Sequence, residues 1–235
     1  MGLDARVPVL TRPRNDPGQY DDLADEWWRE RGAFEPLHWL AKARAALIPP
    51  GTGTLLDVAC GGGLLAPHVR GYHHVGVDIG TSATRIARQH GVTTVQGDVL
   101  RLPVKDAAAD VVVAGEIFEH VRDLDGVVAE IARVLRPGGT LVCDTLSDSW
   151  LSRFVMVTVA ERLPFVPAGI HDPALFVSPR RLQETCARYG IDLKVRGLRP
   201  SVTDALAWQV RAKDEVRMLP TRWTGVVYQG VGVRR

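Results

Sequence analysis

The most constraining feature of this sequence is an apolar run that ends near a carboxylate and then breaks into glycines. Residues 55–58, with the sequence LLDV, precede Ala59, Cys60 and three consecutive glycines at 61–63. Because glycine lacks a Cβ atom, such a run permits a sharp turn from a strand into a helix and lets a ligand lie against the backbone. The pattern predicts a cofactor crevice at the end of a buried strand.

Two further strand-like runs also end on acidic residues. Asp78 lies about 20 residues beyond the turn, the distance expected of a carboxylate that binds ribose hydroxyls. Asp98 ends a third run and can accept a hydrogen bond from an adenine amine. We expect the cofactor site to comprise Asp57, Ala59, Gly61, Gly63, Asp78, Ile79, Asp98, Val99 and Glu116.

Two classes of cofactor fit these residues. Gly61, Gly63 and Ala66 also follow the dinucleotide spacing, so an NAD(P)-dependent oxidoreductase is an alternative. Asp57 precedes the turn, and a carboxylate there suits a cationic ligand better than a pyrophosphate. S-adenosylmethionine carries an amine and a sulfonium, so it is the predicted cofactor. A protein that binds it without catalysis is a second alternative.

The composition indicates one globular enzyme domain. A chain of 235 residues that is 46% hydrophobic can bury one sizeable core. A net charge of +2 argues against a nucleic-acid partner. Three widely spaced cysteines indicate a reduced compartment, and we find neither a signal-like region nor an apolar run near 18 residues. The expected location is the cytoplasm.

Strand-like and helix-like patterns alternate along most of the chain. The expected strands are 54–59, 74–79, 92–97, 110–115 and 140–145, with helices that include 82–90 and 126–135. A helix at 179–189 and strands at 193–195 and 226–233 follow. This alternation predicts an α/β fold, a Rossmann-like, doubly wound and mostly parallel sheet covered by helices on both faces.

We expect a flexible arm at 1–18 and a single domain at 19–235. Within the domain, 19–50 should form a helical cap, with helices at 20–31 and 36–48, and 150–178 should form an insertion after the fifth strand. The segment Trp150 to Pro167 is apolar around most of a helix, but its charged residues oppose membrane spanning. It is either a core helix or a flap that makes peripheral membrane contact.

These motifs together carry a family resemblance. Residues 55–63, 76–79, 97–98 and 135–139 resemble the successive motifs of class I S-adenosylmethionine-dependent methyltransferases. A narrower set resembles the ubiquinone-biosynthesis O-methyltransferase family: Trp27-Trp28, residues 32–38 (GAFEPLH), 116–121 (EIFEHV), 169–172 (GIHD) and Phe176. The resemblance implies methyl transfer to a hydroxyl of a small aromatic or quinone-like, lipophilic substrate.

The sequence departs from the family pattern at two places. Ala59 stands where the superfamily usually has glycine, and residues 147–149 (SDS) replace an Asn-containing turn of the narrower family. The second departure bears on which ring substituents the substrate carries.

The expected catalytic residues follow the fourth strand. A phenol has a pKa of about 10, so a base or a cation is useful at neutral pH. Glu116, Glu119 and His120, at helical i, i+3 and i+4 spacing, can serve as a base or hold a divalent cation such as magnesium, which the family resemblance also implies. Alternatively, Glu119 and His120 cap a helix, or His120 acts as a base without metal.

His171 is a fourth candidate catalytic residue. It is either a direct substrate contact or part of a loop turn that Asp172 stabilises.

Overall fold

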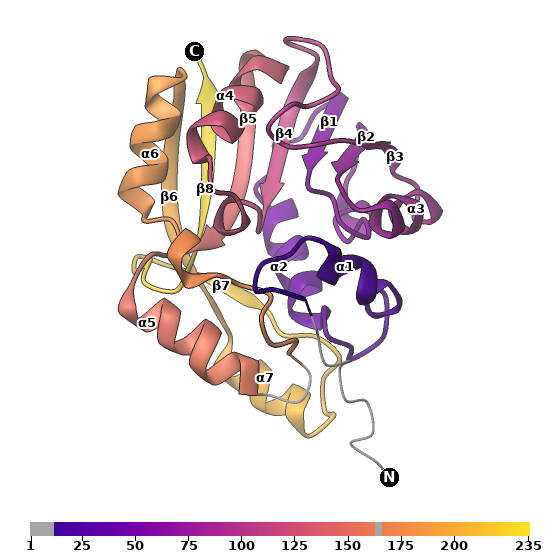
Figure 1. The fold of residues 1–235 in the computed structure, drawn as a ribbon, viewed down its shortest axis with the longest axis vertical. Helices are drawn as coiled ribbons and strands as arrows, with labels where there is room; N and C mark the ends of the chain where they lie inside the picture. The colour runs from indigo at the N-terminus through magenta and orange to yellow at the C-terminus, as the bar shows by residue number, and fades with distance from the viewer. Residues whose placement is uncertain (1–11, 163–165) are drawn as a thin grey trace.

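The computed structural model describes residues 12–162 and 166–235, which fold around one central sheet of eight strands (Figure 1). The strands follow one another in space as β3-β2-β1-β4-β5-β8-β6-β7. Their bounds are β1 Gly53–Val58, β2 Tyr72–Asp78, β3 Thr93–Gln96, β4 Ala109–Gly115, β5 Leu135–Leu146, β6 Ile191–Pro200, β7 Met218–Thr221 and β8 Val227–Arg234. β1 to β5 pair in parallel, whereas β8 runs antiparallel between β5 and β6. The predicted fold class is confirmed.

This strand order creates a switch point at one end of the sheet. β1 pairs with β2 on one side and with β4 on the other, so the chain reverses its direction of progress across the sheet at β1. In open α/β sheets, ligands bind outside the carboxyl ends of the strands at such a switch point. The glycine turn after β1 and the candidate catalytic residues after β4 therefore lie at the same end.

Helices cover both faces of the sheet. The helices are α1 Gly18–Asp22, α2 Glu35–Ala45, α3 Thr81–Gln89, α4 Leu124–Val134, α5 Trp150–Arg153, α6 Pro179–Arg188 and α7 Val202–Gln209. Leu56 of β1 packs in one core cluster with residues of α4 and α6, whereas its neighbour Leu55 packs with residues just after α2. This alternation follows from the two-residue period of a strand and buries β1 on both faces.

The N-terminal region differs from the expected long helix at 20–31. Between residues 12 and 34, the chain forms only α1 and a 3-10 turn at Ala24–Glu26. Trp27 and Trp28 explain the break, because Trp27 packs into a buried cluster while Trp28 donates to the carbonyl oxygen of Gly62. Two consecutive residues of a continuous helix point in different directions, so they could not both contact the glycine turn as Trp27 and Trp28 do.

The expected flexible arm also differs where the structure describes it. Residues 1–11 lie outside the described part of the chain, but Asn15 donates its backbone N–H to Gly169 and the Gln19 side chain donates to Pro13 and Gly169. Residues 12–17 thus pack onto the segment after α5. α7 and β7, which extend the edge of the sheet, were absent from the sequence-based prediction.

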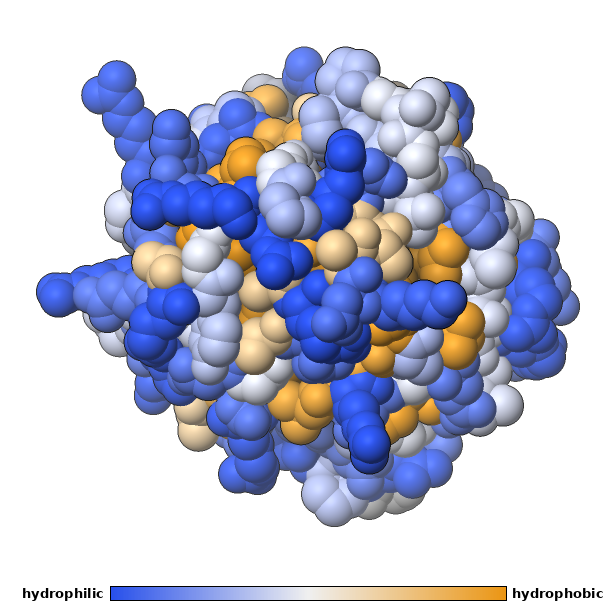
Figure 2. Space-filling view, turned by 90° about the horizontal axis from the view of Figure 1, so that it is seen from above, coloured by the Kyte–Doolittle hydropathy of each residue, from blue (hydrophilic) through white to orange (hydrophobic). Residues whose placement is uncertain are grey.

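The surface differs between the two ends of the sheet. Figure 2 looks down on the upper end in Figure 1, where projecting charged side chains separate the apolar residues into small areas. At the lower end, α5 and the π-helical Phe154–Val159 expose Trp150 and Phe154, and α7 exposes Val202 and Leu206. Among the described residues, none of the helices combines the length and hydropathy needed to cross a bilayer.

Candidate functional site at the strand ends

The glycine turn after β1 is buried beneath an aromatic side chain. A Cβ atom on Gly61 would lie 2.4 Å from the Trp27 ring, and one on Gly62 would lie 2.6 Å from it. Ala59, just before the turn, has a φ of 57°, a conformation that L-residues rarely adopt. The backbone here therefore forms a cradle for a flat group, and in this structure the indole of Trp27 fills it.

Asp78 holds this turn against the end of β2. Its Oδ2 accepts the N–H of Gly61 and its Oδ1 accepts the N–H of Gly80, both at 2.8 Å. Burial raises the pKa of Asp78, while these two hydrogen bonds oppose the rise. Because each carboxylate oxygen can accept a second hydrogen bond, Asp78 can still receive ribose hydroxyls.

The other expected cofactor residues lie in different surroundings. Asp57 is buried and its Oδ2 lies 3.3 Å from Nε2 of His74, so it sits within the sheet beside β2. Asp98 is exposed and accepts the N–H of Leu100 in a local turn. Ile79 is exposed next to Asp78, and Val99 is partly buried. Ile79 offers the apolar surface on which an adenine ring can pack.

Two carboxyl groups are buried at the end of β4. Glu116 has a φ of 52°, which ends the strand, and Glu119 lies in the 3-10 turn Phe118–His120. Thr145 donates to Oε2 of Glu119 at 2.6 Å. Within the described part of the chain, Oε1 of Glu116 and Oε1 of Glu119 are both buried without a hydrogen-bond partner. Unpaired buried carboxyl oxygens are costly unless a proton shared between the two groups, a water molecule or a ligand satisfies them.

The electrostatics of this pair follow from burial. Desolvation is the main cause that raises the pKa of Glu116, and the neighbouring charge of Glu119 raises it further. Desolvation likewise raises the pKa of Glu119, against the hydrogen bond from Thr145. A proton is therefore readily held on one of the two carboxyl groups near neutral pH.

A buried ion pair forms the floor below Glu116. Arg44 of α2 donates from Nε and Nη2 to the carboxylate of Asp144 on β5, at 2.8 and 2.7 Å. The backbone N–H of Glu116 also lies 3.1 Å from Oδ1 of Asp144. This network, which sequence reasoning missed, fixes the strained turn at Glu116.

His120 completes the site with contacts to the N-terminal segment. Its Nε2 lies 3.1 Å from the hydroxyl of Tyr20, and its Nδ1 lies 2.5 Å from Oδ1 of Asn15. The ring of His171 stacks on it at a centroid distance of 5.3 Å. Burial lowers the pKa of His120 to about 3 and that of His171 to about 4. Both imidazoles are therefore neutral at pH 7 and can bind a metal, but burial also makes each of them a weaker base than a free imidazole.

The grouping of possible metal ligands differs from the sequence-based expectation. In the part of the chain that the structure describes, ligand atoms of Glu119, His120 and His171 lie within 4.8 Å of one another. Glu116 does not belong to this group, because its positive φ places it before the turn and helical spacing does not apply to it. Asp172 accepts the N–H of Ala174 in a loop turn beside His171, one of the two alternatives that the sequence left open for this segment.

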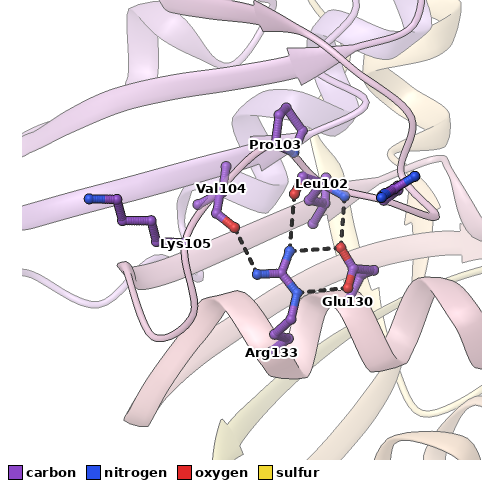
Figure 3. A pocket seen from close by; sticks show the side chains of 7 residues that line it. Leu102, Pro103, Val104, Lys105, Glu130 and Arg133 are labelled. Carbon is purple, nitrogen blue, oxygen red and sulfur yellow. Dashed lines mark hydrogen bonds and ion pairs between the residues drawn. The ribbon is translucent and has the colours of Figure 1, made fainter.

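A separate surface pocket lies away from the strand ends (Figure 3). Arg133 of α4 reaches across it to the carbonyl oxygens of Leu102 and Val104 and to the carboxylate of Glu130. Because this guanidinium already donates to these groups, we interpret its role as structural: it connects α4 to the segment after β3.

Comparisons with known proteins agree with this geometry. A methyltransferase domain model matches residues 56–143. The ubiquinone biosynthesis O-methyltransferase of Hahella chejuensis is 33% identical over 82% of this chain and 87% of its own length. The ubiquinone biosynthesis O-methyltransferase of Vibrio atlanticus is 33% identical over 74% of this chain and 81% of its own length. A solved methyltransferase structure from Thermotoga maritima has the same fold, with a TM-score of 0.69 and 19% identity over 92% of this chain and 97% of that chain.

Proposed function

Because the chain belongs to the ubiquinone biosynthesis O-methyltransferase family, we propose that it methylates a hydroxyl of a catechol-type or quinone-like, lipophilic ring. Family membership makes it an S-adenosylmethionine-dependent O-methyltransferase and disfavours the NAD(P)-dependent alternative. One observation carries the assignment of the site: two buried carboxyl groups without full hydrogen bonding, and a neutral imidazole, lie at the strand ends beside a glycine cradle.

The residues around the cradle fit this cofactor. Asp78 would receive the ribose hydroxyls, and Gly61 and Gly63 would let the backbone approach the cofactor closely. Ile79 and Val99 would pack on the adenine, and Asp98 has a carboxylate at the surface to accept from its amine. Glu116 offers an unpaired carboxyl oxygen to the other amine of the cofactor, the one on its amino-acid part. Trp27 must leave the cradle or shift within it for the cofactor to enter.

Asp57 would act indirectly. Its carboxylate lies below the turn beside His74, where its charge contributes to a negative potential without direct contact. Ala59 would contribute through its strained backbone.

The chemistry needs alignment and a deprotonated oxygen. The bound cofactor supplies an electrophilic methyl group on a sulfonium. His120 would take the proton of the substrate hydroxyl at Nε2, the atom that lies 3.1 Å from the Tyr20 hydroxyl in this structure, so the substrate would replace Tyr20 at that position. Tyr20 packs edge-on against His120 and would help to exclude water, and His171 stacks beside His120.

The proposal includes a divalent cation such as magnesium bound at this site. Glu119, His120 and His171 present one oxygen and two nitrogen ligands in one cluster, and Glu116 has a free carboxyl oxygen nearby. Such a cation would favour the ionised form of the substrate hydroxyl. Excess chelator should abolish turnover without loss of cofactor binding, and full activity in chelator would reject the metal.

The proposal also includes peripheral membrane contact through the insertion that begins at α5. Trp150 and Phe154 are 77% and 50% exposed, and both lie within the insertion that begins at α5. Exposed aromatic side chains of this kind bury favourably in the headgroup region of a bilayer, where a polyprenylated substrate would reside.

A screen of acceptors tests the proposed substrate class. Catechols, hydroquinones and amines would be incubated with isotope-labelled S-adenosylmethionine and analysed by mass spectrometry. The proposal expects labelled methyl ethers of the catechols or hydroquinones. Transfer to amines alone would reject a hydroxyl substrate.

A further inference from the structure

Asn15 makes two complementary contacts with one catalytic side chain and its backbone. Its Nδ2 donates to the backbone carbonyl oxygen of His120 at 3.0 Å, and its Oδ1 lies 2.5 Å from Nδ1 of the same residue. We propose that Asn15 is a positioning residue that places the proton of the neutral His120 ring on Nδ1 and leaves Nε2 free to accept. The catalytic consequence rests on the proposed function.

The hydrogen-bonding capacities of the atoms dictate this arrangement. A backbone carbonyl oxygen can only accept, so the Asn15 atom that faces it must be the amide nitrogen. The amide oxygen then faces Nδ1 of His120, and since that oxygen can also only accept, Nδ1 must carry the hydrogen. A neutral imidazole carries one hydrogen, so a ring with its hydrogen on Nδ1 has none on Nε2.

The surroundings of Nε2 agree with an acceptor. The Tyr20 hydroxyl lies 3.1 Å from Nε2 and can donate to it. This contact pairs the basic nitrogen with a phenol, the same functional group as the proposed substrate. Asn15 therefore prepares His120 to face a phenolic hydroxyl.

The backbone of Asn15 is held firmly enough to orient a neighbour. Its N–H donates to the carbonyl oxygen of Gly169 at 2.9 Å. The adjacent Arg14 forms an ion pair with Glu161 and donates to the carbonyl oxygen of His171. The segment that carries Asn15 is thus anchored to the loop that carries His171, whose ring stacks on His120.

The test reads the tautomer directly. Long-range proton–nitrogen NMR spectra of the full chain, labelled with 15N-histidine, would be recorded at neutral pH, with the His120 signals assigned through a His120→Asn variant. We expect a proton on Nδ1 in the wild type and on Nε2, at least in part, in Asn15→Ala. Asn15→Asp keeps the acceptor and should keep Nδ1 protonated. A wild-type proton on Nε2, or no change in Asn15→Ala, would overturn the proposal.

Arg14→Ala provides the matched control, because it loosens the same segment without a contact to His120. It should leave the tautomer unchanged, and an equal change there would mean that anchoring of the segment, and not Asn15, sets the ring. In turnover, Asn15→Ala should lower kcat about 10- to 100-fold with unchanged S-adenosylmethionine affinity, the range seen when an orienting partner is lost. Asn15→Asp should recover part of that loss. Since the spectra need no substrate, they stand even if the proposed methyl transfer fails.

Discussion

The guanidinium of Arg44 passes over Gly115 and pairs with the carboxylate of Asp144, joining α2 to the ends of β4 and β5. A Cβ atom at Gly115 would lie 1.9 Å from Cζ of Arg44, so this path needs glycine. Arg44→Met should leave the Asp144 carboxylate buried without its cation and lower the free energy of unfolding by about 3–5 kcal/mol. Chemical denaturation would measure the loss.

The double variant Arg44→Met with Asp144→Leu is the control for this pair. Removal of both charges should cost less than removal of the arginine alone, since no buried charge is then unpaired. If the double variant is the less stable of the two, the pair does not account for the effect of Arg44.

Asp78 should be the most sensitive cofactor residue. Asp78→Ala is expected to weaken S-adenosylmethionine binding by about 1.5–3 kcal/mol, the scale of a hydrogen bond to a charged group, and it also releases the Gly61 turn. Asp98→Ala should have a smaller effect, because Asp98 is exposed. Calorimetry on the two variants tests the ranking, which an equal or larger loss at Asp98 would reverse.

The sequence predicts much of this fold because the parallel strands contain apolar runs with glycines or acidic residues at or near their ends. β1 and β4 are mostly buried and contain short apolar runs, and β4 ends at Gly115 whereas β2 ends at Asp78. The acids at strand ends and the Glu119-His120 pair could be found in the same way. His171, which stacks on His120, could be nominated only through the family resemblance.

Contacts between distant segments could not be predicted. Asn15 and Tyr20 reach His120 from about 100 positions away, and Arg44 reaches Asp144 over a similar distance. None of them belongs to a motif with a fixed spacing. Two edge elements escaped prediction. β7 has only four residues and includes Pro220, and Val202 and Leu206 of α7 have helical spacing but are exposed.

The buried imidazole of His120 should make stability depend on pH. Its pKa falls from 6.5 to about 3 in the folded protein, so the unfolded chain binds the proton first and folding becomes less favourable as pH falls below 6.5. Between pH 7 and pH 5, the wild type should lose about 1–2 kcal/mol more stability than His120→Asn does. Denaturation of both proteins at the two pH values measures this difference, and a constant gap between them would contradict a depressed pKa.

The exposed aromatic residues of α5 and its continuation should bind membranes without contributing much to folding. Trp150→Ser combined with Phe154→Ser should keep the melting temperature within a few degrees and reduce binding to liposomes. Leu151→Ser, at a partly buried position on the same helix, should instead lower the melting temperature. Unchanged liposome binding in the double variant would place the membrane contact elsewhere or reject it.

The central claim is that His120, beside the two buried carboxyl groups, activates a ring hydroxyl for methylation. The most direct test is the rate of labelled methyl transfer from S-adenosylmethionine to a polyprenylated catechol, measured for the wild type and for His120→Ala. Calorimetry would measure cofactor binding by both proteins. The wild type should form one labelled methyl ether, and His120→Ala should bind the cofactor normally but react at least about 100-fold more slowly. Equal rates in the two proteins, or no transfer by a wild type that binds the cofactor, would contradict the claim.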